Sequence, residues 1–141
     1  MARRRVSAIV AAGFVAAGLS TGIAWAGGEG GTVQPDDISV AVGTGEFINE
    51  LAGFTAYGPN NDAAAAAVIA ACQAAGGVEC TADEVTNDNL CIVSVASDST
   101  DVVAGGAGPT IEAARQDALN KAIANGTPEG ADAVVVVSAC P

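Results

Sequence analysis

Residues 58–77 read GPNNDAAAAAVIAACQAAGG, and residues 108–126 read GPTIEAARQDALNKAIANG. In both stretches a Gly-Pro pair introduces an alanine-rich run that stops at glycine, and the two pairs lie fifty residues apart. Alanine has the highest helix propensity and glycine commonly ends helices. The stretches therefore predict two helices, over residues 63–75 and 111–126, with Thr110 capping the second. Either two related halves share an origin, or the same local pattern was used twice.

Short apolar segments around these helices predict strands. They cover residues 38–42, 50–58, 79–86, 90–97, 102–108 and 133–140. Turn-forming residues at 43–45, 87–89 and 98–101 separate them. The last segment is a continuous β-branched run, which indicates a strand buried on both faces or central in its sheet. We expect an α+β fold, a small mixed sheet of four to five strands with two helices packed on it, in the order β-α-β-β-β-α-β.

Residues 1–26 have the pattern of a secretory signal peptide. Three arginines precede an apolar stretch, and Ala24 and Ala26 form the A-x-A pattern before Gly27, the expected first mature residue. The alternative is a membrane anchor, but the run is rich in Ala and Gly and has no basic residues flanking its C-terminal end. Arg3 and Arg4 also match the start of a twin-arginine signal, but the rest of that pattern is weak, so we expect the general secretory route. We expect a flexible Gly-rich leader at residues 27–37, then a single domain at 38–141, secreted or held in the cell envelope with no membrane contact after cleavage.

The composition excludes several functions. The chain has 5 Lys and Arg residues, 16 Asp and Glu residues and no His, which gives a formal net charge of −11. Without His there is no Ser-His-Asp triad, no Cys-His dyad and no imidazole metal site. Nucleic-acid binding is excluded because it needs a stripe of Lys and Arg. After removal of residues 1–26 the charge is −14, and only Phe47, Phe54 and Tyr57 are aromatic.

The four cysteines indicate a disulfide framework, because a small exported domain with a thin Ala-rich and Val-rich core needs covalent support. Cys72 and Cys80 flank a glycine pair that turns the chain, so a short bridge between them is geometrically easy. Cys91 begins a middle strand and Cys140 ends the last strand, and these ends meet if the two strands are antiparallel neighbours. We favour this pairing among the three that four cysteines allow.

Four features together resemble an exported bacterial family, common in actinobacteria and known only as domain of unknown function 4189. The features are Ala56-Tyr57-Gly58 before the Ala-rich helix that ends in Cys72, the order of the cysteines, Gly106-Ala107-Gly108-Pro109-Thr110 before the second helix, and the terminal Val137-Ser138-Ala139-Cys140. The match spans about residues 53–141. The resemblance implies paired cysteines and supplies no catalytic residues. This chain is poorer in aromatic and basic residues than the family pattern.

Three carboxylate pairs are candidates for acid–base chemistry. They are Asp36 with Asp37, Asp83 with Glu84, and Asp98 with Asp101. Two carboxylates at a suitable separation can hydrolyse glycosides, but carbohydrate sites normally stack sugars on aromatic side chains, which are scarce here. Most of these acids are expected to be solvated surface groups.

Other candidate sites are weaker. Oxygen ligands for calcium are available from Asn87, Asp88, Asn89, Asp98 and Asp101, but no complete calcium-loop motif is present. The glycine-rich residues 105–108 precede a helix as in a phosphate cradle, yet their surroundings are acidic, and close helix packing is the simpler reading. Residues 125–127 match an N-glycosylation acceptor. No zinc pattern exists, and neither a metal nor another cofactor is expected.

We therefore expect a non-catalytic exported domain that binds a protein or envelope partner, with an acidic surface that prefers cationic partners. The alternatives are a secreted hydrolase that uses a carboxylate pair and a structural envelope protein without a specific ligand. The sequence does not indicate the partner or the oligomeric state.

Overall fold

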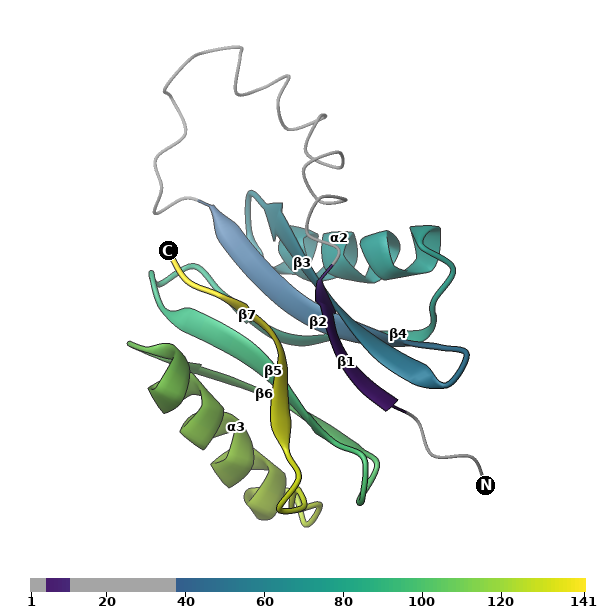
Figure 1. The fold of residues 1–141 in the computed structure, drawn as a ribbon. Coiled ribbons are helices and arrows are strands. Elements are labelled where there is room, and N and C mark those ends of the chain that lie inside the picture. The colour runs from purple at the N-terminus through teal and green to yellow at the C-terminus, as the bar shows by residue number, and fades with distance from the viewer. Residues whose placement is uncertain (1–4, 11–37) are drawn as a thin grey trace.

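The computed structural model describes residues 5–10 and 38–141, which form two helices and seven strands (Figure 1). In chain order these are β1 (Arg5–Val10), β2 (Ser39–Phe47), β3 (Glu50–Gly58), α2 (Asn61–Ala74), β4 (Val78–Thr86), β5 (Cys91–Ser97), β6 (Val102–Gly108), α3 (Ile111–Ala124) and β7 (Val134–Ala139). The predicted α+β class and both predicted helices are confirmed. The prediction of a single mixed sheet is wrong, because the strands divide into two sheets with the orders β1-β3-β2-β4 and β6-β5-β7.

The two sheets repeat one topology. β2 and β3 form an antiparallel hairpin, α2 follows, and β4 returns to pair with the other side of β2. In the second half β5, β6, α3 and β7 have the same arrangement. The predicted order placed one strand before the first helix, whereas the structure has a hairpin there. The Gly-Pro and alanine-rich pattern that recurs after fifty residues therefore corresponds to two ββαβ units.

The start of each helix is capped in the same way. The side chain of Asn60 accepts a hydrogen bond from the backbone N–H of Ala63, and the side chain of Thr110 accepts one from Ala113. Both caps have extended backbone angles. An oxygen at the N-cap satisfies one of the first N–H groups that have no partner within the helix. Thr110 is thus the cap that its position in the sequence predicted.

The ends and buried faces of the helices repeat as well. Gly76 and Gly126 follow the two helices with φ angles of 95° and 80°, a conformation that favours glycine. Buried helical positions are again fifty residues apart: Ala64, Val68 and Cys72 in α2, and Ala114, Ala118 and Ala122 in α3. The second unit keeps the small residues that let the helix lie close to its sheet.

Residues 43–45 do not form the predicted turn, because β2 runs through them as one nine-residue strand. A Cβ atom on Gly43 would overlap the backbone carbonyl of Thr81, and one on Gly45 would overlap the sulfur of Cys72. These glycines therefore serve close packing rather than chain reversal. The reversal comes later, at Ile48 and Asn49, where Asn49 has a φ of 63°.

The elements stack in four layers (Figure 1). α2 covers the outer face of the first sheet, where Phe54 and Val68 belong to one buried cluster. α3 covers the outer face of the second sheet, where Val93 and Ala118 belong to another. Between the sheets lie two smaller clusters: one contains Val42, Ile92 and Val137, and the other contains Leu51, Ala96 and Val136. The core is thus distributed over three interlayer spaces.

β7 packs on both faces but is not central. It pairs only with β5 within its sheet, so β5 is the central strand, and every residue of β5 is buried. Val135 of β7 packs toward the α3 cluster, whereas Val137 packs between the sheets. Only Val136 and Val137 of the strand are buried and Val134 is 45% exposed, so the run is neither buried throughout on both faces nor central, and both predicted alternatives are wrong.

Two disulfides join parts of the same unit. Cys72 at the end of α2 is bonded to Cys80 in β4, with Cα atoms 5.9 Å apart. Cys91 at the start of β5 is bonded to Cys140 just after β7, with Cα atoms 4.1 Å apart. The pairing is the one that the sequence favours. The second bond follows from the ladder, because β5 and β7 are antiparallel and Ile92 lies opposite Ala139.

Removing the longer bridge should destabilise the domain more than removing the shorter one. The sequence separations of 49 and 8 residues correspond to about 4 and about 2.5 kcal/mol of loop entropy in the unfolded chain. The paired substitution Cys91→Ser/Cys140→Ser should lower Tm by roughly 6–12 °C more than Cys72→Ser/Cys80→Ser. Paired variants leave no lone thiol, and calorimetry of both under the same conditions checks the order. Equal or reversed shifts would contradict the expectation.

Candidate functional site

A cavity of about 270 Å³ lies at one end of the sandwich, where the start of β2, the end of β3, the β4–β5 turn and the C-terminus meet. Its apolar lining comes from Ile38, Val40, Tyr57, Leu90 and Pro141, together with Cys140 of the longer disulfide. Its polar lining consists of Thr86, Asn87 and Asn89. Residues distant in the sequence thus form one hollow.

The polar rim of this end pocket is built by the β4–β5 turn. The Thr86 hydroxyl accepts a hydrogen bond of 3.0 Å from the backbone N–H of Asp88. Asn89 has a φ of 60°, an angle that asparagine tolerates better than most residues. The turn predicted over residues 87–89 is confirmed, and it presents two amide side chains to the pocket.

Tyr57 gives the pocket an aromatic face. It is the single tyrosine of the chain, and 40% of its surface is exposed. None of the side chains that line the pocket is acidic or basic. Such a surface can hold an uncharged group by apolar contact and by hydrogen bonds to amides and hydroxyls.

The carboxylates of Asp83 and Glu84 point into different surroundings. The β2–β4 ladder passes from Glu84 to Ala82 and leaves Asp83 as an extra, bulged residue. Glu84 accepts a hydrogen bond of 3.0 Å from the Lys121 ammonium on α3. The two neighbouring acids therefore have different partners, although burial and the charge of Glu84 both contribute to raising the pKa of Asp83.

Asp83 lies between the sheets inside a ring of hydroxyl groups. Its carboxylate accepts hydrogen bonds from Thr81 at 2.7 Å, Ser94 at 2.8 Å and Thr44 at 3.0 Å. The donors come from β4, β5 and β2, so this network ties both sheets together. Burial raises the pKa of Asp83 above its usual value, and the three hydrogen bonds oppose that shift.

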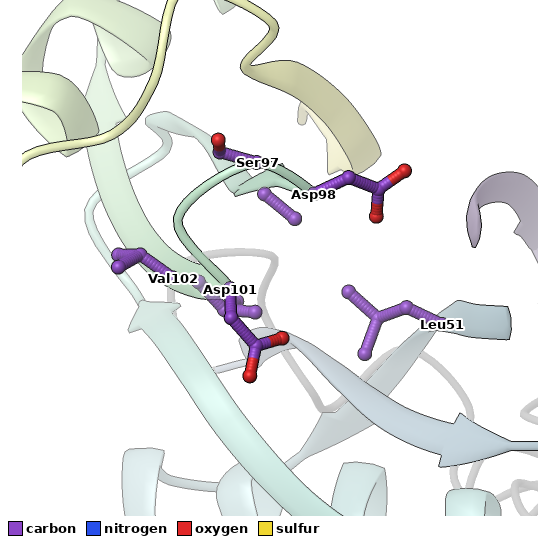
Figure 2. A pocket seen from close by; sticks show the side chains of 7 residues that line it. Leu51, Ser97, Asp98, Asp101 and Val102 are labelled. Atoms are coloured by element: carbon purple, nitrogen blue, oxygen red, sulfur yellow. The ribbon is translucent and has the colours of Figure 1, made fainter. Parts of the chain in front are cut away.

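Asp98 and Asp101 do lie close together, in the β5–β6 turn. With Leu51 of β3 they border a small hollow of about 10 Å³, room for about one water molecule (Figure 2). Figure 2 shows both carboxylates and the Leu51 side chain directed toward this hollow. Asp36 and Asp37, the remaining pair, are outside the described residues.

The oxygen groups proposed for calcium are not brought together. Asn87, Asp88 and Asn89 precede β5, whereas Asp98 and Asp101 follow it, so the seven residues of β5 separate the two groups by roughly 20 Å. Within the described residues no three His, Cys, Asp or Glu side chains are placed to hold a metal ion.

The glycine-rich residues 105–108 allow α3 to pack closely on its sheet, which was the simpler of the two hypotheses for them. A Cβ atom on Gly106 would overlap the backbone of Ala114 and Ala118 in α3. The N–H of Ala107 donates a hydrogen bond of 2.9 Å to the carboxylate of Asp117, which would repel a phosphate.

The glycosylation acceptor at residues 125–127 directly follows α3, and all three of its residues are exposed.

A second acidic cluster, between α3 and β7, was missed by the sequence reading. Asp132 accepts hydrogen bonds from the hydroxyls of Ser97 at 2.6 Å and Ser99 at 2.7 Å. Both carboxylate oxygens of nearby Glu129 are buried, and neither has a hydrogen-bond partner among the described residues. Burial and the charge of Asp132 raise the pKa of Glu129 to about 7, and the serine hydroxyls lower that of Asp132 to about 2.

Ala24, Ala26 and Gly27, the residues of the predicted cleavage site, lie outside the described residues. Arg5–Val10, near the start of the same predicted signal peptide, forms strand β1, which pairs in parallel with β3. None of the described helices is long and apolar enough to span a membrane.

One family model matches the chain. It covers residues 38–140 and carries the description "Domain of unknown function (DUF4189)". No curated protein and no solved structure matches the chain.

The Asp83 network can be tested by two substitutions with opposite outcomes. Asp83→Ala leaves three hydroxyls without their acceptor and should lower the free energy of unfolding by about 1–3 kcal/mol. Asp83→Asn keeps an acceptor and removes the buried charge, so it should be at least as stable as the wild type at pH 7. Since the pKa of Asp83 is raised from 3.8 on folding, the wild type should lose stability relative to Asp83→Asn as pH rises above about 4. Urea titrations at pH 4 and pH 7 measure this, and an Asn variant as unstable as the Ala variant would refute it.

Glu129 should make stability depend on pH near neutrality. Its raised pKa favours the protonated form in the folded state, so the stability it contributes is complete below about pH 4.5 and is lost as pH rises through about 7. Glu129→Gln should therefore melt at a higher temperature than the wild type at pH 8, with the gap closing toward pH 4. Glu112→Gln, at a site with an 81% exposed side chain, is the matched control. A constant gap across this pH range would contradict the expectation.

Proposed function

Because this chain belongs to the DUF4189 family, whose description names no activity, its role has to be inferred from its own surface, and we propose that it is an exported, non-catalytic binding domain. The end pocket holds an uncharged, largely apolar group of the partner. The observation that carries this proposal is the pocket lining, which combines apolar side chains with two amides and has no acidic or basic side chain. A few polar groups within an apolar hollow are typical of binding sites.

The size of the pocket limits what it holds. A volume of about 270 Å³ is just below the roughly 300–1,000 Å³ of pockets for drug-sized ligands. One bulky side chain of a peptide, or a small ring, fits that space. Asn87, Asn89 and the Tyr57 hydroxyl provide hydrogen-bonding groups at the rim that can orient such a ligand.

Export is supported by the cysteines and by the N-terminal pattern. All four cysteines are bonded in pairs, which is typical of an oxidising compartment such as the cell envelope or the medium. The arginines, apolar run and A-x-A pattern of residues 1–26 fit a secretory signal that is removed.

The charge of the chain favours a cationic partner around the pocket. With a formal net charge of −11, or −14 without residues 1–26, the domain attracts basic protein or envelope groups and repels anionic ones. The affinity for such a partner should fall as salt rises.

A hydrolase is the second candidate, and one observation favours it. The diverging pKa values of Glu129 and Asp132 resemble those of a general acid and its ionised neighbour. Neither residue lines the end pocket, and Asp83, Glu84, Asp98 and Asp101 do not line it either. Binding at the end pocket therefore has the stronger structural support.

Binding at the end pocket can be measured with a neutral hydrophobic dye, N-phenyl-1-naphthylamine, whose fluorescence rises in apolar surroundings. The wild type should bind the dye, and Leu90→Asp should weaken binding at least tenfold, because a carboxylate in an apolar pocket has to be desolvated. The control Ile48→Asp changes a 91% exposed residue at the opposite end of the β2–β3 hairpin and should leave binding unchanged.

Equal binding by the two variants would show that the dye sits elsewhere. No binding by a folded wild type would favour a structural envelope protein. Turnover of glycans or peptides that Glu129→Gln abolishes would favour the hydrolase.

A further inference from the structure

The two open sides of the sandwich are closed in different ways. On one side β4 and β6 approach so closely that a Cβ atom on Gly105 would overlap the carbonyl of Asp83. The ion pair between Lys121 and Glu84 spans the same side. On the other side β1, Arg5–Val10, lies along the outer edge of β3 and also contacts β7 (Figure 1). The second side is thus closed by a segment that the sequence predicts to be removed.

The pairing of β1 with β3 is short and irregular. Arg5 lies opposite Glu50 and Val6 opposite Leu51, but the next registered pair is Val10 with Gly53, which leaves extra residues in β1. The edge of β3 continues to Gly58, and no described residue pairs with that edge beyond Gly53. A longer and more regular strand could therefore pair along the whole edge.

The β3 edge lacks the features that normally prevent strand addition. From Leu51 to Gly58 it contains no charged residue and no proline, and its ladder with β2 is regular over nine pairs. The opposite edge strand, β4, carries Glu79, Asp83 and Glu84 and has two register shifts. Charges and bulges protect edges from pairing with other chains. Protection is therefore present on β4 and missing on β3.

The start of the β3 edge is acidic. Glu50 is the first residue of this edge. Leu51, which follows it, lines the small hollow together with Asp98 and Asp101 (Figure 2). A strand that runs parallel to β3, as β1 does, brings its N-terminal end to these carboxylates. Basic residues at that end are complementary to them, and β-branched apolar residues suit the uncharged remainder of the edge.

We propose that the outer edge of β3 is a strand-docking site that Arg5–Val10 fills in the unprocessed chain and that cleavage opens. Its ligand in the processed protein is an extended partner segment that begins with basic residues, continues with β-branched apolar ones, and pairs in parallel with β3. Strand addition of this kind takes its affinity from backbone hydrogen bonds and its specificity from side chains. The site depends on the cleavage proposed above and is independent of the end pocket.

The test uses the full chain expressed in an exporting bacterial host, with the processed protein recovered from the medium and its N-terminus sequenced. The probe is a fluorescent peptide with the sequence of residues 2–11, ARRRVSAIVA. Fluorescence anisotropy should show binding at least tenfold tighter than for a scrambled peptide, and also tighter than for a peptide carrying Ser7→Pro and Ile9→Pro. Proline removes the N–H groups that strand pairing needs. The unprocessed, oxidised chain should bind at least tenfold more weakly, because β1 fills the edge.

Matched variants locate the site. Glu50→Gln should weaken peptide binding several-fold at low salt, whereas Glu112→Gln on α3 should not. Leu90→Asp should leave peptide binding unchanged, which separates this site from the end pocket. Hydrogen exchange should show slower exchange of β3 amides when the peptide is bound.

Four results would overturn the proposal. They are retention of residues 5–10 in the exported protein, equal binding of the scrambled peptide, slower exchange confined to strands other than β3, and a dimer that protects β3 without peptide. The last result would assign the edge to a second copy of the chain.

Discussion

Close contact between the backbone of each helix and the strand beneath it is the interaction on which the rest of this structure depends. Phe54 and Ile92 are the largest fully buried side chains, and most of the other buried hydrophobic positions hold valine or alanine. Small side chains bury little area each, so the layers gain stability by approaching until backbone atoms touch. Gly106 beneath α3 and Gly58, the last residue of β3, beneath the first turn of α2 have no room for a Cβ atom. The two ββαβ units solve this packing problem in the same way.

This packing explains what the sequence could and could not predict. The helices were predictable because alanine runs, capping residues and terminal glycines act locally. The glycines of β2 were misread, because a glycine that admits a neighbouring layer and one that permits a turn look alike in a sequence. The division into two sheets was not predictable for a related reason. Which strand pairs with which depends on contacts such as that between Gly105 and Asp83, which lie far apart along the chain.

The candidate sites also differ in whether local sequence or long-range contacts determine them. The disulfide pairing could be argued from element ends alone, since Cys91 and Cys140 sit at ends that antiparallel strands bring together. The end pocket could not, because its lining comes from strand ends, a turn and the C-terminus. Asp132 and its serine donors also lie more than thirty residues apart in the chain. Asp83 and Glu84, which are neighbours in the sequence, have different partners because Asp83 is a bulged residue held by hydroxyl groups, whereas Glu84 is paired with Lys121 on α3.

The bond between Cys91 and Cys140 encloses the whole second ββαβ unit in a covalent loop with a sequence separation of 49 residues. A domain in the cell envelope can be pulled at its two ends, for example when it links an anchored component to a moving one. Tension entering from the N-terminal side reaches Cys91, crosses the disulfide to Cys140 and leaves through the chain beyond Cys140. The hairpin, helix and last strand of the second unit therefore carry no load while the bond is intact. Mechanical extension stretches the first unit only, so the molecule has one yielding half and one half shielded from force.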